Sequence, residues 1–242
     1  MGHLHNLSHV DDFLFGVPFY GARGHGGSYW GIPEAWRTVL AGGAPLASIF
    51  AAVLVALTVS SEFEWRTSRQ NGIDGLSRNN WLFAKFLLLP AICLALYGTQ
   101  IILGASLAFL DTHAAHKSIY YPASTYVTAG FGVWLAMCCY SLIALLISIW
   151  VRSPGPAIGL TIIYQVFDNI VARTLRGFHL DSIAAWLPFQ VHSALLEFDQ
   201  YLPRPSPALD YHWGTWNLLL AGMLWAAAFA IASRWVYLRR DL

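Results

Sequence analysis

Five long apolar runs occupy most of this chain, and they constrain its fold more than any other feature. They cover about residues 37–60, 81–110, 124–151, 155–175 and 214–238. A helix needs roughly 20 apolar residues to cross the ~30 Å hydrocarbon core of a bilayer, whereas membrane strands are shorter and alternate in polarity. The sequence therefore predicts an all-α, polytopic membrane bundle of about five spans, surrounded by membrane lipids.

Several function classes leave no trace in the sequence. The net charge of +1 gives no sign of nucleic-acid binding. Neither lysine, Lys85 or Lys117, follows a glycine-rich phosphate-binding loop, and no histidine lies well inside a span, as a haem-binding bundle would need. The cysteines Cys93, Cys138 and Cys139 fall within apolar runs. We expect them to be small packing residues.

The distribution of Lys and Arg predicts the orientation, because cytoplasmic loops carry an excess of both residues. If the spans alternate, eight basic residues fall on one side: Arg66, Arg69, Arg78, Lys85, Arg152, Arg234, Arg239 and Arg240. Six fall on the other side, in longer segments: Arg23, Arg37, Lys117, Arg173, Arg176 and Arg204. The C-terminus is therefore expected in the cytoplasm. Residues 1–35 then form an external tail, and the external loop 176–213 is expected to contain a short amphipathic helix.

The connection 61–78, SEFEWRTSRQNGIDGLSR, is crowded with charge between two apolar runs. It can be helical from Glu62 to Gln70 and breaks at Gly72 and Gly75. Ser77 is placed to cap the helix of the second span. A solvated cytoplasmic loop is the simplest interpretation. The alternative is a short helix along the membrane that offers a polar surface to a soluble partner.

Two further groups of residues leave alternatives open. Asp168, in YQVFDNIVAR, is an intramembrane carboxylate and hence a functional candidate, or it lies near the end of a short span and pairs with Arg173 or water. Imidazole groups suit zinc, copper and nickel, but no histidine spacing matches a closed site. The weak metal candidates are His3, His5, His9, His113 and His116, for which the alternative is solvated loop histidines.

Three short motifs resemble the permease subunits of ABC-2-type ABC transporters. The first is the pattern E-F-E-x-x-T-x-R, then G-x-S-R, then a lysine. In this chain it comprises Glu62, Phe63, Glu64, Thr67, Arg69, Gly75, Ser77, Arg78 and Lys85. The others are LIALLISIWVRSPGPAIGL (142–160) and WLPFQVHSALL (186–196). The resemblance covers about residues 36–242, which would form the transmembrane domain.

The resemblance implies a non-catalytic subunit of an exporter in the inner or plasma membrane. The segment 61–80 would be a cytoplasmic coupling helix docked on a separate ATPase subunit, which would hold the ATP and magnesium. The contact or positioning group would then comprise Glu62, Glu64, Thr67, Arg69, Gly75, Ser77 and Arg78. A second copy, or a related permease, would complete the path. This chain would need no cofactor of its own.

One departure from the family concerns the number of spans. Such permeases have six spans with both ends in the cytoplasm, and this chain has five, with 33–64 resembling the family's second span. A late start site, a truncated permease or a helix supplied by another chain would each explain an external N-terminus. Two rival functions stay open: a membrane scaffold or metal-handling maturation protein that uses external histidines, and a secondary transporter that uses Asp168.

Overall fold

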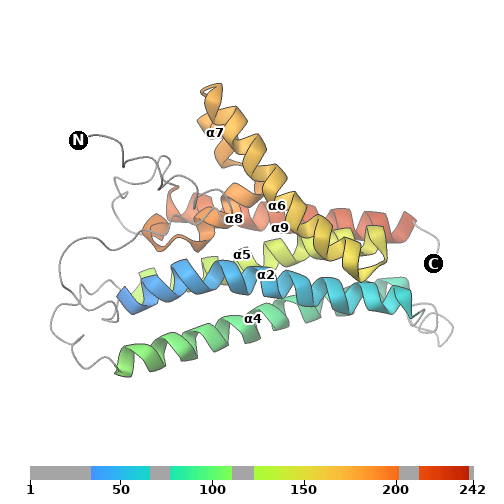
Figure 1. The fold of residues 1–242 in the computed structure, drawn as a ribbon, viewed down its shortest axis with the longest axis horizontal. Coiled ribbons are helices and arrows are strands. Elements are labelled where there is room, and N and C mark those ends of the chain that lie inside the picture. Colours follow the sequence, from blue (N-terminus) through green and yellow to red (C-terminus); the bar gives the residue numbers. More distant parts are fainter. Residues whose placement is uncertain (1–33, 66–76, 111–122, 202–212, 240–242) are drawn as a thin grey trace, which may run out of the picture.

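A computed structural model describes residues 34–65, 77–110, 123–201 and 213–239, and all regular structure within these ranges is helical (Figure 1). Five helices are long and apolar enough to cross a membrane. They are α2 (Glu34–Glu64), α4 (Arg78–Leu110), α5 (Ala123–Val151), α6 (Pro154–Gly177) and α9 (Thr215–Arg239). The expected all-α, multi-pass architecture is confirmed.

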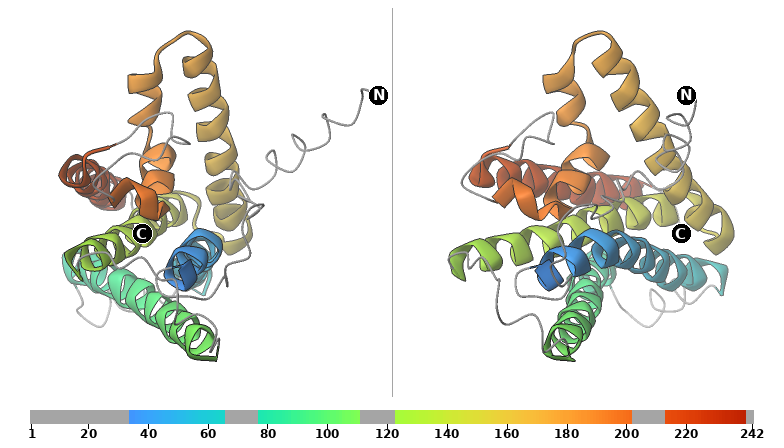
Figure 2. Two further views of the ribbon diagram at one scale, coloured as in Figure 1. Left: turned by 90° about the vertical axis from the view of Figure 1, so that its left-hand side faces the viewer. Right: turned by 60° about the vertical axis from the view of Figure 1, so that its left-hand side comes forward.

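Helix α5 lies at the centre of the bundle, and α2, α4, α6, α8 and α9 all pack against it (Figures 1 and 2). In its most apolar window 83% of the residues are buried, against 17% in α4 and 22% in both α6 and α9. The other spans each keep a broad apolar face on the outside, which is the face that a bilayer would cover.

The packing of α2 on α5 depends on small side chains. The buried residues of α2 recur every three or four positions, which places them on one face of the helix; they include Ala44, Ala47, Ser48, Ala51 and Val55. Small residues let two helix backbones approach closely in a membrane. The large side chains of Leu46, Phe50 and Leu54 are exposed on other faces of α2.

Helix α6 runs away from the bundle after a two-residue turn, and the chain then returns through two short helices (Figure 2). These are α7 (Asp181–Ala185) at the far tip and α8 (Pro188–Leu196), followed by the 3-10 helix η2 (Phe198–Tyr201). Six of the nine side chains of α8 are buried, and α8 packs on α5 and α9. The described part of the segment 176–213 is thus helical, and the amphipathic, interfacial character expected for its helix stays a prediction.

The approach of α9 to α5 and α8 is closest at Gly222. A Cβ atom at this position would lie 2.8 Å from Leu135 Cδ2 and 2.9 Å from Leu195 Cδ1. No side chain fits there without a shift of both leucines, so glycine sets how tightly the C-terminal helix joins the core.

Candidate functional site

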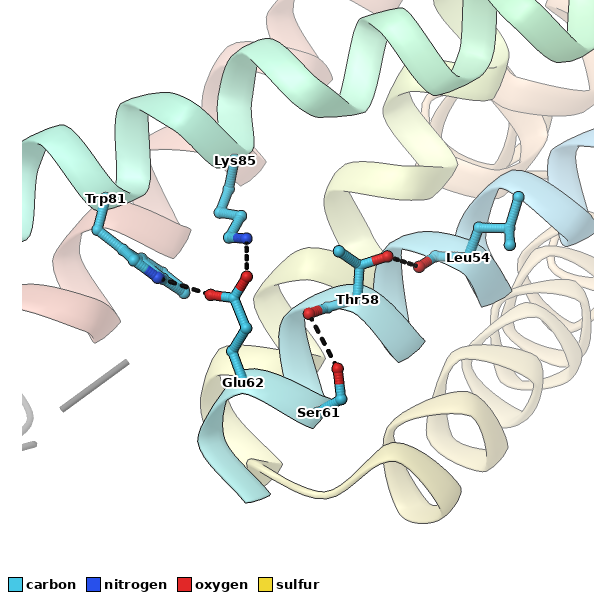
Figure 3. Close-up of polar contacts among 6 residues, drawn as sticks. All are labelled: Leu54, Thr58, Ser61, Glu62, Trp81 and Lys85. Carbon is cyan, nitrogen blue, oxygen red and sulfur yellow. Dashed lines mark hydrogen bonds and ion pairs between the residues drawn. The ribbon is translucent and has the colours of Figure 1, made fainter. Parts of the chain in front are cut away.

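The charged connection is flanked by two helix ends that are tied together by a carboxylate. Glu62 lies in the last turn of α2, and Trp81 and Lys85 lie in the first two turns of α4. Glu62 Oε2 accepts a hydrogen bond of 2.8 Å from Trp81 Nε1, and Glu62 Oε1 forms an ion pair with Lys85 Nζ (Figure 3). The contact fixes the geometry of the two helices on either side of residues 66–76.

A layer of aromatic rings extends this contact to the rest of the bundle. Trp81 packs against Phe63 of α2, with 5.5 Å between ring centroids, and stacks on Tyr237 of α9 at 4.7 Å. The guanidinium of Arg152, in the turn between α5 and α6, lies 5.4 Å from the centroid of the Phe63 ring. We call the group Glu62, Phe63, Trp81, Lys85, Arg152 and Tyr237 the basic end.

The backbone of Arg152 is left-handed, with φ of 61°. This conformation is uncommon for a residue other than glycine, and it lets α6 begin only two residues after α5 ends. The side chain is thereby directed at Phe63. The turn at the base of α6 and the end of α2 are therefore in direct contact.

The predicted coupling residues divide into two groups. Glu62, Glu64, Ser77 and Arg78 are described, whereas Thr67, Arg69 and Gly75 lie outside the described residues. The two glutamates belong to the final turn of α2. Residues 62–64 are helical as expected, but as the end of α2; a separate coupling helix stays a prediction, because residues 66–70 lie outside the described residues.

The capping role of Ser77 is confirmed. Helix α4 begins at Arg78, and the backbone N–H of Asn80 donates to Ser77 Oγ at 3.2 Å. A serine oxygen at this position satisfies one of the backbone donors that a helix start leaves unpaired. Glu64 and Arg78 are exposed beside these helix ends, where a protein partner could reach them.

The described basic residues predicted to share one side do lie at one end of the bundle. Arg78 starts α4, Arg152 lies between α5 and α6, and Arg234 and Arg239 lie in the last turns of α9. The start of α4, the turn between α5 and α6 and the end of α9 all lie at the right of Figure 1.

A second polar group lies between α5, α6 and α8, and we call it the polar seam. It comprises Tyr140, Thr161, Tyr164, Gln165, Asp168, Asn169, Arg176, Gln190 and His192. The Tyr140 hydroxyl lies 3.1 Å from Gln165 Oε1 and 3.3 Å from the Thr161 carbonyl oxygen. Gln190 Nε2 donates to Asn169 Oδ1 at 3.0 Å.

Asp168 is buried in this seam, with 4% of its surface exposed. The Phe189 backbone amide, the Gln190 amide and the Tyr164 hydroxyl face its carboxyl group, but its Oδ2 atom has no hydrogen-bond partner within the described ranges. Asp168 precedes the end of α6 at Gly177 by nine residues. The carboxyl group is therefore enclosed. Arg173, the partner that the alternative interpretation predicted, has an exposed side chain.

His192 of α8 also lies in the seam, shielded from solvent. The side chain is 5% exposed and packs between Tyr140 and Phe189, with 5.2 Å between ring centroids in both cases. Neither ring nitrogen has a hydrogen-bond partner among the described residues. Burial lowers the pKa of His192 to about 4, so the imidazole is neutral at physiological pH.

The metal-site hypothesis rests on residues that the structure does not describe. His3, His5, His9, His113 and His116 all lie outside the described ranges. Within those ranges, no group of three or more His, Cys, Asp or Glu side chains is arranged to hold a metal ion. Cys93, Cys138 and Cys139 are buried free thiols, as expected for packing residues.

Sequence reasoning missed the partners that complete both groups. Trp81 precedes Lys85 by four residues, a spacing that places both on one helix face and that could have singled out this pair. Tyr140 and His192 carry no comparable signal, because residues 52 positions apart meet only through the return of α8.

Comparison with known proteins gives one match. Residues 12–242 match the family described as "Protein of unknown function (DUF2705)". No curated protein and no solved structure matches the chain.

Proposed function

Because the chain belongs to the DUF2705 family, whose description assigns no activity, we propose its function from its own residues. The protein is the membrane-spanning, non-catalytic subunit of an ABC exporter of the ABC-2 type. A separate cytoplasmic ATPase subunit binds ATP and magnesium and drives it. A second copy or a related permease completes the transporter. The chain lies in the inner or plasma membrane with its C-terminus in the cytoplasm.

The observation that carries this proposal is the tie between α2 and α4. A coupling segment transmits force only if its two ends are held firmly by the spans on either side. Glu62 joins those spans through Lys85 and Trp81, directly beside residues 66–76. A plain solvated loop would not need such an anchor.

The aromatic layer supports the same function. Trp81 contacts both Phe63 and Tyr237, and Phe63 contacts Arg152. A displacement of the connection would therefore reach α9 and the base of α6 through side chains already in van der Waals contact. Packed interfaces transmit small displacements because protein interiors are close-packed.

Exposed charge supplies the proposed docking surface. Glu64 and Arg78 are exposed at this end of the bundle, and Thr67, Arg69, Gly75 and Ser77 complete the motif in sequence. Charged groups at a protein interface determine orientation and partner choice. In this proposal Glu64 and Arg69 contact the ATPase, whereas Glu62 and Ser77 hold the helices that present them.

The test is co-expression with each ATP-binding subunit that the genes neighbouring this chain encode, followed by copurification and measurement of ATPase stimulation. The variant Glu64→Lys with Arg69→Glu should lower affinity at least about tenfold, or about 1.4 kcal/mol, because both contacts become repulsive. Asp181→Lys is the matched control, since Asp181 is exposed on α7 at the far tip.

The outcome is decisive in both directions. Loss of association in the double reversal, with normal association of Asp181→Lys, supports the coupling role. Equal copurification of the wild type and the double reversal removes it, provided that both proteins unfold at the same temperature.

A further inference from the structure

We propose that Asp168 is a binding site for a monovalent cation, either a proton or an alkali ion, in the seam between α6 and α8. This site is separate from the basic end and does not depend on the proposed coupling to an ATPase. Nothing in the description of the family assigns it.

The first argument is the state of the carboxyl group. Asp168 is 4% exposed, and its Oδ2 atom finds no hydrogen-bond donor in the described part of the chain. The donors of Phe189, Gln190 and Tyr164 offset part of the cost of removing an ionised carboxylate from water, and the unpartnered Oδ2 leaves the rest uncompensated. A cation on the free oxygen offsets this cost.

The second argument is the chemistry of the surroundings. The polar groups nearest Asp168 are neutral ones, contributed by Phe189, Gln190 and Tyr164. One carboxylate among neutral groups matches a single positive charge. Calcium and magnesium favour sites with several charged oxygen ligands, so the single negative charge of Asp168 favours a monovalent cation.

The third argument is a series of hydrogen bonds that passes beside the site. Arg176 Nη2 donates to Gln190 Oε1 at 2.9 Å, and Gln190 donates to Asn169. Asn169 Nδ2 donates to the Gln165 carbonyl oxygen at 3.1 Å. The Tyr140 hydroxyl closes the chain at the side chain of Gln165.

This chain connects the exposed end of α6 with the core of the bundle. Residues 165 and 176 are 11 apart, or about 16 Å along a helix, which is about half of the hydrocarbon thickness of a bilayer. Arg176 is exposed, whereas Tyr140 is 1% exposed. Asp168 lies beside the middle of this chain, next to Asn169.

The other titratable groups around Asp168 are Tyr164 on α6, Tyr140 on α5 and His192 on α8. Arg173 and Arg176 are the basic residues of α6 closest to it in sequence, and both are exposed. His192 is the only one of these groups with an ordinary pKa near neutrality. It therefore needs its own control in any pH experiment.

The test is thermal unfolding of the purified full-length chain in detergent micelles, followed by tryptophan fluorescence. Sodium or potassium chloride replaces choline chloride at constant ionic strength, and in a second series the pH varies between about 6 and 8, where exposed carboxyl groups stay ionised. The proteins are the wild type, Asp168→Asn, His192→Phe and the exposed-site control Asp181→Asn.

A cation that binds only the folded protein stabilises it in proportion to occupancy. Above its dissociation constant, each tenfold rise in cation concentration should raise the ratio of folded to unfolded protein about tenfold. We expect this response in the wild type and in Asp181→Asn, and its loss in Asp168→Asn. A response to sodium or potassium identifies an alkali ion, and a response to falling pH identifies a proton.

Three results would overturn the proposal: no response in the wild type, the same response in Asp168→Asn, or a pH response that disappears only in His192→Phe. If Asp168→Asn does not fold, infrared difference spectra of the wild type replace it. The difference between the spectra with and without the cation should contain a carboxyl band. This band should shift when the aspartates carry an isotope label. A difference spectrum without an aspartate band contradicts the site.

Discussion

Glu62 and Asp168 are both shielded acidic residues of membrane helices, but their surroundings differ. Glu62 has a cation and an indole N–H as partners, whereas Asp168 has neutral neighbours and one carboxyl oxygen without a donor among the described residues. The first arrangement is self-contained, as a structural joint should be. The second leaves one carboxyl oxygen open to a ligand from outside the described residues, as the proposed cation site requires.

The largest expected effect tests the contact of Glu62 with Lys85 and Trp81. Glu62→Ala leaves the ammonium group of Lys85 largely shielded without its carboxylate, and removes the acceptor of Trp81. We expect a loss of about 3 kcal/mol in the free energy of unfolding, at the lower end for a broken buried pair. Chemical denaturation in micelles measures it.

Two controls sharpen this result. Glu64→Ala, two residues further along and exposed, should change stability by less than about 0.5 kcal/mol. The double variant Glu62→Ala with Lys85→Met should recover most of the loss, because no unpaired charge remains. Equal losses of stability in the two glutamate variants would mean that Glu62 does not hold α2 and α4 together.

The next effect tests whether a carboxylate of the polar seam pairs with the imidazole of His192. Burial lowers the pKa of His192 from 6.5 to about 4 in the folded protein, so the unfolded chain binds the proton more tightly. Stability is complete above about pH 6.5 and falls as the pH falls towards 4, by roughly 2 kcal/mol between pH 7 and pH 5.

The measurement is the midpoint of chemical denaturation against pH, for the wild type and for His192→Phe. The variant keeps an aromatic ring between Tyr140 and Phe189, but that ring cannot be protonated. Its free energy of unfolding should therefore fall by roughly 2 kcal/mol less than that of the wild type between pH 7 and pH 5. A wild type that gains stability on acidification relative to His192→Phe would show instead that a carboxylate pairs with the imidazole.

The smallest effect has the opposite sign to the first. Without added alkali salt, at about pH 8, Asp168→Asn should raise the free energy of unfolding by about 1 kcal/mol. The variant keeps the shape of the side chain and removes a buried charge that the neighbouring donors compensate only in part. Asp181→Asn, at an exposed position, should have no effect. A loss as large as that of Glu62→Ala would mean that Asp168 has a permanent partner.

Much of the architecture was predictable because it follows from local properties. The five spans need only length and hydropathy, and the cap at Ser77 needs only a serine just before a helix. The basic end was partly predictable, since the motif contained Glu62 and Lys85. Their pairing was not, because it depends on how α2 and α4 meet across residues 66–76. The roles of Thr67, Arg69 and Gly75 stay predictions.

The central position of α5 and the polar seam were not predictable for a different reason. A lipid-facing side chain and a buried one are equally apolar, so hydropathy does not distinguish the inner from the outer face of a span. The alanines and serine of α2 were an overlooked signal of close packing. His192 gave no signal, since its burial follows from the return of α8 onto α5.

The central helix also has a consequence for biosynthesis. Tyr140 of α5 packs against Phe189 and His192 of α8, Cys139 Sγ donates to the Gly222 carbonyl oxygen of α9, and α9 ends 88 residues after α5. At about 5–20 residues per second, those polar side chains wait roughly 5–20 s in the translocon or bilayer before α8 and α9 enclose them. The third span to be made is thus among the last to be completed, and a membrane insertase or chaperone that shields it during this interval would determine the yield of folded protein.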